Sequence, residues 1–208
     1  MTTARQSLSG EMADVVARTR RSLVHIQDGR RGVGAGSIWH PDGLIVTNAH
    51  VAGSRRLRVT LRDGRELPAR VLALDSGLDL AALVVEADGL PAIELGDSRG
   101  LRPGQLVLAM GHPWGVSGAV TTGAVIGTGP RLPDTPSPER EWIVAGLRLR
   151  PGHSGGPMMD VHGRLVGINT MITGPQVAVA VPVHVAKDFL NEALRAEQSR
   201  RRAAPGRA

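Results

Sequence analysis

Short apolar segments dominate this sequence, and turn residues separate them at intervals of about 8 to 12 residues, the spacing of an all-β domain. The segments are rich in Val, Ile, Leu and Thr. Connecting pieces such as HPDG at 40–43 and RPG at 102–104 have the chemistry of tight turns. The chain holds 27 Gly and 14 Pro, which fits many turns, and little helical pattern lies between the segments. The pattern therefore predicts antiparallel β-barrels rather than a parallel α/β sheet.

The predicted strands divide into two sets of equal size. The least strand-like stretch, 88–104, lies between the sets and is interpreted as the connection between two barrels. The sequence thus predicts an all-β fold of two six-stranded antiparallel barrels with short helices at both ends. The predicted strands are 23–27, 32–39, 44–48, 57–61, 67–74, 80–85, 105–110, 119–127, 142–145, 156–159, 165–170 and 177–181.

Both ends of the chain differ from the strand-rich middle. Segment 1–22 is predicted to be helical, with Ser9 as its N-cap and apolar Met12, Val15 and Val16 at helical spacing. The barrels are expected at 23–97 and 98–183, and segment 184–208 is expected to be a helix followed by a basic tail. Residues 199–208 have no apolar period and are expected to fray.

The net charge of +6 belongs to these ends, because residues 31–194 hold 15 basic and 15 acidic residues. The neutral body argues against a nucleic-acid partner. No apolar run reaches the roughly 18 residues of a membrane helix, so no membrane partner is expected. Charged residues interrupt the N-terminal segment, which therefore lacks a signal-peptide core. A cytoplasmic location is predicted, with periplasm or secretion as the alternative if the N-terminus is a processed form.

The chain has no cysteine, which excludes disulfides, a thiol nucleophile and Cys-ligated zinc. The strongest chemical signal is PGHSGGP at 151–157. Small neighbours of Ser154 let an acyl group approach, and they let backbone N–H groups converge on an oxyanion. The alternative interpretation of this segment is a glycine-rich turn with no catalytic role. The nucleophile elbow of α/β-hydrolases also fits formally, but Pro157 and strand-like residues follow Ser154, and 208 minus 154 leaves only 54 residues for its partners.

A histidine and an acid precede this serine. His50 follows one predicted strand, and Asp79 opens a strongly apolar one, where an unpaired carboxylate would be costly. An imidazole N–H is a natural partner for that carboxylate. The order His, Asp, Ser is that of the two-barrel serine proteases.

The segments TNAHV, DLAAL and PGHSGGP, in this order and at this spacing, resemble the HtrA (Deg-type) branch of the trypsin-like serine proteases. Further similar segments are GAGSI at 34–38, LAMG at 108–111, GINT at 167–170 and AVP at 180–182. Together they cover roughly residues 12–190. Any one motif is weak, but their ordered combination is specific.

The resemblance implies a serine endopeptidase that cleaves unfolded or flexible polypeptides, with Ser154 as nucleophile, His50 as general base and Asp79 as its orienting group. The backbone N–H groups of Gly152 and Ser154, with that of His153 nearby, would form the oxyanion hole. No cofactor and no metal is implied. The substrate pocket would be lined by Leu149, Thr170, Met171 and Ile172, which favours aliphatic side chains, while Arg148 and Arg150 are expected to point to solvent.

The sequence departs from the family at His153, where an asparagine is usual. This histidine is interpreted either as a pH-sensitive element or as a neutral side chain bonded to a nearby loop. The second hypothesis for the whole protein is a latent protease-fold chain that binds a peptide or partner. The family's PDZ domain is not expected after residue 183. A homo-oligomer stays open, but no aromatic residue precedes Trp39, which argues against the family's trimer.

The remaining histidines and tryptophans receive plain interpretations. Trp114 and Trp142 are expected to pack in the core or at the rim of the cleft. No functional role is assigned to His25, His40, His112, His162 and His184.

Overall fold

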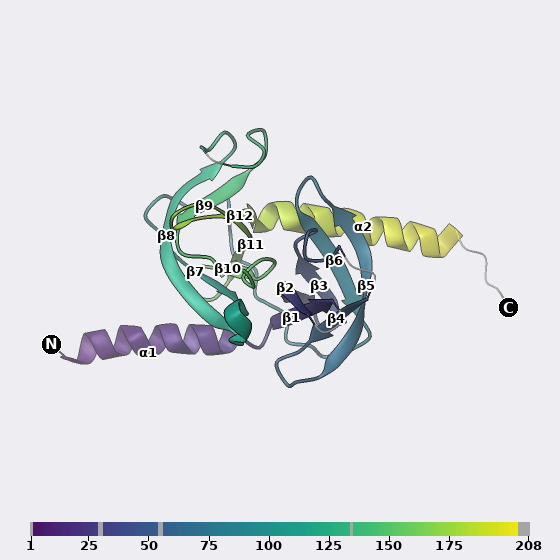
Figure 1. Ribbon diagram of the computed structural model, residues 1–208, viewed down its shortest axis with the longest axis horizontal. Coiled ribbons are helices and arrows are strands. Elements are labelled where there is room, and N and C mark those ends of the chain that lie inside the picture. The colour runs from purple at the N-terminus through teal and green to yellow at the C-terminus, as the bar shows by residue number, and fades with distance from the viewer. Residues whose placement is uncertain (1, 29–30, 54–55, 134, 204–208) are drawn as a thin grey trace.

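The computed structural model describes residues 2–28, 31–53, 56–133 and 135–203. Two closed barrels of six antiparallel strands lie next to each other, as Figure 1 shows. Helix α1 (Thr2–Thr19) extends from one end of the molecule, and helix α2 (Val183–Ala203) packs against strands of both barrels. The predicted fold class, two six-stranded antiparallel barrels flanked by helices, is confirmed.

The first barrel has the strand order β1-β2-β3-β6-β5-β4. Because β3 and β6 are antiparallel neighbours, with Thr47 opposite Ala81, the chain leaving β3 meets the chain entering β6 at one rim of the barrel. This pairing brings the loop of His50 beside the turn of Asp79. The strands are β1 (Leu23–Asp28), β2 (Arg31–His40), β3 (Leu44–Thr47), β4 (Leu57–Thr60), β5 (Glu66–Asp75) and β6 (Leu80–Val85).

The second barrel has the order β10-β11-β12-β9-β8-β7. Pro157 lies opposite Ile168, so the loop that enters β10 with Ser154 lies beside Thr170 of β11. The strands are β7 (Leu106–Gly111), β8 (Ala119–Gly129), β9 (Trp142–Gly146), β10 (Pro157–Met159), β11 (Leu165–Gly174) and β12 (Val177–Pro182).

Aliphatic side chains fill both barrels, as the low aromatic content requires. Ile26, Ile45 and Leu83 are fully buried in the first barrel, and Ile143 and Met158 in the second. A further cluster contains residues of both barrels together with Trp142 of β9 and Phe189 of α2. Burial of this shared cluster fixes the two barrels against each other, which matters because the site draws on both.

The helices differ from the prediction in extent. Helix α1 begins at Thr2, so Ser9 lies inside it and is not its N-cap. Helix α2 continues to Ala203, so the prediction that the chain frays from residue 199 is wrong for 199–203, and residues 204–208 lie outside the described part. No helix among the described residues is both long and apolar enough to cross a membrane.

Candidate active site

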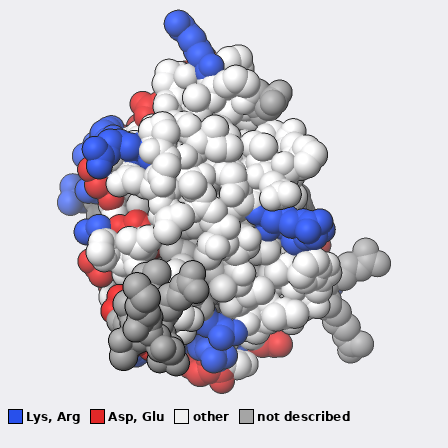
Figure 2. All heavy atoms as spheres, turned by 90° about the vertical axis from the view of Figure 1, so that its left-hand side faces the viewer, with Lys and Arg blue, Asp and Glu red and all other residues white. Residues whose placement is uncertain are grey.

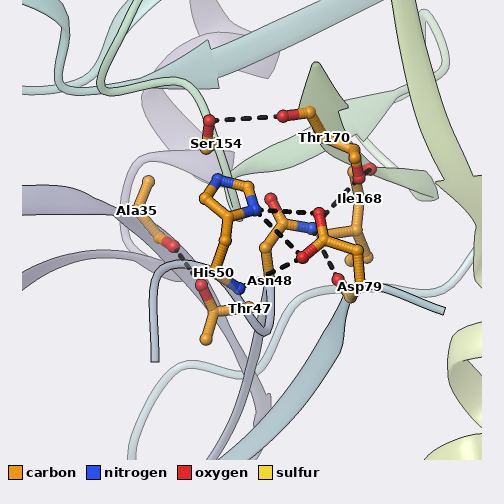
Figure 3. Close-up of polar contacts among 8 residues, drawn as sticks. All are labelled: Ala35, Thr47, Asn48, His50, Asp79, Ser154, Ile168 and Thr170. Atoms are coloured by element: carbon orange, nitrogen blue, oxygen red, sulfur yellow. Dashed lines mark hydrogen bonds and ion pairs between the residues drawn. The ribbon is translucent and has the colours of Figure 1, made fainter. Parts of the chain in front are cut away.

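His50 and Asp79 form a close pair at the rim of the first barrel. The imidazole Nδ1 lies 2.9 Å from each carboxylate oxygen of Asp79, and the main-chain N–H of His50 donates to Oδ1 at 3.1 Å. Asp79 is the more buried partner, with its side chain 17% exposed against 50% for His50. Since the carboxylate only accepts hydrogen bonds, Nδ1 carries the proton and Nε2 is left as the basic nitrogen. Figure 3 shows the ring between Asp79 and Ser154.

The buried side chain of Asn48 supports this pair by bonding to the main chain of Asp79. Asp79 has a positive φ of 53°, a left-handed conformation that Asp tolerates better than most residues. Its main-chain carbonyl accepts a hydrogen bond from Asn48 Nδ2 at 2.9 Å, and the same nitrogen donates to Thr170 Oγ1 at 3.0 Å (Figure 3). Asn48 follows β3 by one residue and precedes His50 by two. Sequence reasoning placed Asn48 in a strand and missed this contact, although its position inside the TNAHV motif was a usable signal.

Ser154 comes from the second barrel, in the loop before β10. Its main-chain carbonyl accepts from the N–H of Ala35 on β2, at 2.8 Å, so the loop is fastened to the first barrel. The hydroxyl donates to the carbonyl of Thr170 at 3.3 Å. Among the hydrogen bonds of the described residues, none joins Ser154 Oγ to His50 (Figure 3). The structure thus brings the three predicted side chains together, with the hydroxyl turned to Thr170.

The turn before Ser154 has the features of a type II turn. Pro151 and Gly152 occupy its central positions, Gly152 has a φ of 102°, and the N–H of His153 donates to the carbonyl of Arg150 at 3.0 Å. The N–H groups of Gly152 and Ser154 have no acceptor among the described residues. They are therefore free to bind an oxyanion, whereas the N–H of His153 is already used inside the turn.

Gly155 shows why the serine has glycine neighbours. It has a φ of 79°, and a Cβ at this position would collide with Thr47 Oγ1 and the carbonyl of Ala35. A larger residue would push the serine loop away from the first barrel.

His153 is 3% exposed, and its Nδ1 lies 3.1 Å from both the N–H and the carbonyl of Arg150. Its Nε2 is buried without a hydrogen-bond partner. Burial lowers the pKa of His153. The hydrogen bond to the main chain of Arg150 opposes this shift without reversing it, and the charge of Arg150 adds to the lowering. These contacts fit the interpretation of a neutral histidine bonded to its own loop.

The loop after β7 supports the same turn. It contains a short 3-10 helix (Pro113–Gly115). The ring of His112, just before this helix, packs against that of His25 with the ring centroids 4.8 Å apart and the ring planes tilted by 34°. Burial lowers the pKa of His112 to about 4, with further lowering from His25, Arg20 and His153. His112 is thus a neutral packing residue near pH 7.

A cavity of about 360 Å³ opens beside Ser154. Its lining includes the four predicted pocket residues, Leu149, Thr170, Met171 and Ile172, together with Arg150 and Pro151. Leu149 is buried, whereas Ile172 is 48% exposed at the mouth.

The two arginines before the serine loop differ from each other. Arg148 is exposed as expected. Arg150 departs from the expectation: it is partly buried, it contributes to the cavity, and its guanidinium lies 5.2 Å from the ring centre of Trp114. Trp114 is 75% exposed at the rim, while Trp142 lies in the core, 3% exposed.

A second set of Ser, His and acid lies at the start of α2. Ser98 Oγ is 2.7 Å from His184 Nδ1, and His184 Nε2 is 2.9 Å from Glu141 Oε2. Ser98 is only 4% exposed and its partner nitrogen is Nδ1, so this set fastens the connector between the barrels to α2. No group of three or more His, Cys, Asp or Glu suited to a metal ion occurs within the described part of the chain.

Charge on the face toward α1 is dispersed. Figure 2 shows Lys and Arg side chains in separate groups, with uncharged residues between them. This distribution gives no continuous basic surface among the described side chains of that face.

Comparisons with known proteins agree with the geometry. The family described as trypsin-like peptidase domain matches residues 34–168. A probable periplasmic serine endoprotease, DegP-like, of Halomonas elongata is 40% identical over 170 residues, 78% of this chain and 35% of the relative. Serine protease HTRA1B of Danio rerio is 34% identical over 194 residues, 87% of this chain and 41% of the relative.

Solved structures of an HtrA-type protease, AlgW, are also similar. The complex with a decapeptide has a TM-score of 0.82 at 29% identity and covers 88% of this chain and 67% of that one. The complex with a tripeptide has a TM-score of 0.80 at 34% identity, covering 86% and 62%. The chain spans about 35 to 41% of the length of the curated relatives named above.

Proposed function

The chain belongs to the trypsin-like peptidase family, in its HtrA/DegP-like branch, and we propose from this membership that it is a serine endopeptidase whose triad is His50, Asp79 and Ser154. The observation that supports the proposal most directly is the placement of the His50 imidazole between the Asp79 carboxylate, 2.9 Å from Nδ1, and Ser154 (Figure 3). The pairing fixes the tautomer in which Nε2 is the free base.

The reaction follows from these positions. The Ser154 hydroxyl leaves the Thr170 carbonyl and gives its proton to His50 Nε2, while Oγ bonds to the carbonyl carbon of the substrate. The N–H groups of Gly152 and Ser154 stabilise the oxyanion. The imidazolium then protonates the leaving amine, and water hydrolyses the acyl-enzyme through the same base. One oxyanion donor contributes about 10² to 10³ in rate, so the geometry of the turn matters in addition to the triad.

We propose aliphatic residues before the scissile bond and unfolded or flexible polypeptides as substrates. Leu149, Met171 and Ile172 give the cavity apolar walls, and no acidic residue is among those that line it. The stacking of Arg150 on Trp114 holds its charge at the rim. The AlgW structures carry a decapeptide and a tripeptide, which is consistent with a peptide ligand for this fold.

The alternative is a latent protease-fold protein that binds a peptide or partner. The hydrogen bond of Ser154 to Thr170, in place of one to His50, favours this reading of the resting state. The free N–H groups of Gly152 and Ser154 favour a competent oxyanion hole.

Fluorophosphonate labelling and casein hydrolysis test the proposal. Wild type is expected to be labelled and to cleave casein, and Ser154→Ala to do neither. Ser98→Ala is the matched control, because Ser98 also contacts a histidine that is paired with an acid, but it is buried. A folded wild type that stays unlabelled, even with added apolar peptide, contradicts the endopeptidase. Labelling that needs the peptide supports the latent alternative.

A cytoplasmic location is also a proposal, based on the charged N-terminal segment. Relatives named periplasmic make the periplasm the competing location. Cell fractionation of the full chain separates the two.

A further inference from the structure

Asn48 is fully buried at the boundary between the barrels, and its side-chain amide contacts one segment from each. Nδ2 donates to the main-chain carbonyl of Asp79 in the first barrel, at 2.9 Å, and to Thr170 Oγ1 in the second, at 3.0 Å. An amide nitrogen carries two hydrogens, so both donors are used. Figure 3 shows these bonds to the right of the His50 ring, beside Asp79.

The direction of the amide is fixed by its partners. The Asp79 carbonyl can only accept, and Thr170 Oγ1 already donates to the carbonyl of Ile168 at 3.3 Å. Turning the amide over would place its oxygen against two groups that need a donor. Asn48 Oδ1 is buried without a partner, which costs about 1–3 kcal/mol for such a group. The two donated bonds are retained despite that cost.

One acceptor belongs to a member of the triad, Asp79, and the other to Thr170, which contacts a second member, Ser154. Asp79 must keep its left-handed backbone for its carboxylate to reach both the main-chain N–H and Nδ1 of His50. Thr170 presents its carbonyl to the Ser154 hydroxyl. A continuous series of hydrogen bonds therefore runs from the orienting acid through Asn48 and Thr170 to the nucleophile, and it crosses from one barrel to the other.

We propose that Asn48 is a positioning residue that sets the Asp79 turn of the first barrel against Thr170 of the second, so that His50 and Ser154 face each other. This inference rests on the proposed function. It goes beyond the triad because the two catalytic halves belong to separate barrels, and one amide bonds both. Displacement of a reacting group by about 1 Å costs on the order of 10²-fold in rate, so a single lost bridge is measurable.

The chain offers a matched control in Asn169. It is also fully buried, its Nδ2 donates to the carbonyls of Met110 and Pro157, at 3.3 and 3.0 Å, and its Oδ1 also lacks a partner. Both acceptors belong to the second barrel. Asn169→Leu removes an equivalent buried amide without touching the bridge between the barrels.

Asn48→Leu keeps the branching of the side chain at Cγ, although its methyl groups are larger, and removes the donors. Asn48→Asp keeps both shape and size and turns the donor into an acceptor. Both are expected to lower kcat by about 10²-fold with KM within about threefold, because orientation and not binding is lost. Asn169→Leu is expected to lose thermal stability. Its kcat per folded molecule is expected to fall by less than about tenfold. Equal loss of kcat in the Asn48 and Asn169 variants would overturn the proposal.

A second readout does not need activity. In the Ser154→Ala background, the downfield proton resonance of His50 Nδ1–H reports its bond to Asp79. Asn48→Leu is expected to shift or broaden this signal and Asn169→Leu to leave it in place. An unchanged signal in a folded Asn48→Leu variant overturns the inference even if peptidase activity is absent. If the signal shifts but the wild-type protein has no peptidase activity, the proposed function is wrong and the inference about Asn48 stands.

Thr170→Val keeps the test decisive if the Asn48 variants do not fold. It removes one of the two acceptors of Asn48 and retains the Thr170 carbonyl. An intermediate fall in kcat is expected, and an unchanged kcat contradicts the inference.

Discussion

The main-chain N–H of His112 donates a hydrogen bond to the carbonyl of Gly152 at 2.8 Å. A Cβ at Gly152 would lie 2.6 Å from the His112 carbonyl oxygen and 2.9 Å from the nitrogen of Pro113. The loop after β7 and the turn before Ser154 therefore have no free space between their backbones. A change in one segment should move the oxyanion donors held by the other.

Gly152→Ala is expected to lower the rate of fluorophosphonate labelling by at least about 10²-fold, because the methyl group displaces one oxyanion donor. Gly64→Ala is the matched control: Gly64 has a φ of 88°, and a Cβ there meets nothing within 4 Å. It has the same backbone strain without the collision. Equal labelling of the two variants would show that the contact with His112 is unimportant.

Protonation of His112 should destabilise the fold. Its pKa is lowered to about 4 in the folded protein, while an unfolded histidine titrates near 6.5, so the unfolded chain binds the proton more tightly. The contribution of neutral His112 to the free energy of unfolding is fully present above about pH 6.5. It is lost as the pH falls through about 4, by roughly 3 kcal/mol in total. Urea unfolding at pH 7 and 4.5 should show a smaller loss for His112→Gln. The exposed His162→Gln is expected to behave as wild type.

His153 should make the activity more sensitive to acid. Because burial lowers its pKa, the folded turn favours the neutral ring. Protonation would replace the bond that Nδ1 accepts from the Arg150 N–H by one donated to the Arg150 carbonyl, and would place a second positive charge beside Arg150. His153→Asn is expected to retain more of its labelling rate than wild type as pH falls below about 6.5, the usual histidine value. The ratio of the two rates is the measurement, because it cancels any effect of acid that the two proteins share. Parallel pH profiles would assign His153 to packing alone.

Trp114 should control the charge at the substrate pocket. Its ring holds the Arg150 guanidinium 5.2 Å from the ring centre, an exposed cation–π contact of about 0.5–1 kcal/mol. Trp114→Ala is expected to raise kcat/KM for peptides with Glu before the scissile bond, relative to Val, by roughly two- to fivefold. Adding Arg150→Gln should abolish the rise. A rise that persists without Arg150 has another cause.

The strand pattern predicted the barrels well because each strand's alternation and turn chemistry are local. The segment 80–85 was predicted with the observed bounds, because its six residues are all apolar and the acidic residues Asp79 and Glu86 flank it. Five of the six are buried. The helix ends were predicted less well. Ser9 has N-cap chemistry, but the helix continues to Thr2, and the polar residues of α2 extend its helix past the last apolar contacts.

The residues of the candidate site also divide into those that the sequence predicted and those that it did not. Motif order identified His50, Asp79 and Ser154, because each lies in a short segment of distinctive composition. Asn48, the Ser98–His184–Glu141 set and the position of Arg150 were missed. Each depends on a partner far away in the chain, such as Thr170, 122 residues from Asn48.

The sequence by itself determined the period of the strands, the glycines that permit a type II turn before Ser154, and the residue types needed for acyl transfer. These are local properties, because backbone conformation and side-chain chemistry depend on near neighbours. The tertiary structure decided that the Ser154 hydroxyl bonds to Thr170, that Asn48 bridges the barrels, and that Trp114 holds Arg150. Those contacts join segments from different parts of the chain, and only the packing of one barrel on the other brings them within hydrogen-bonding or stacking distance.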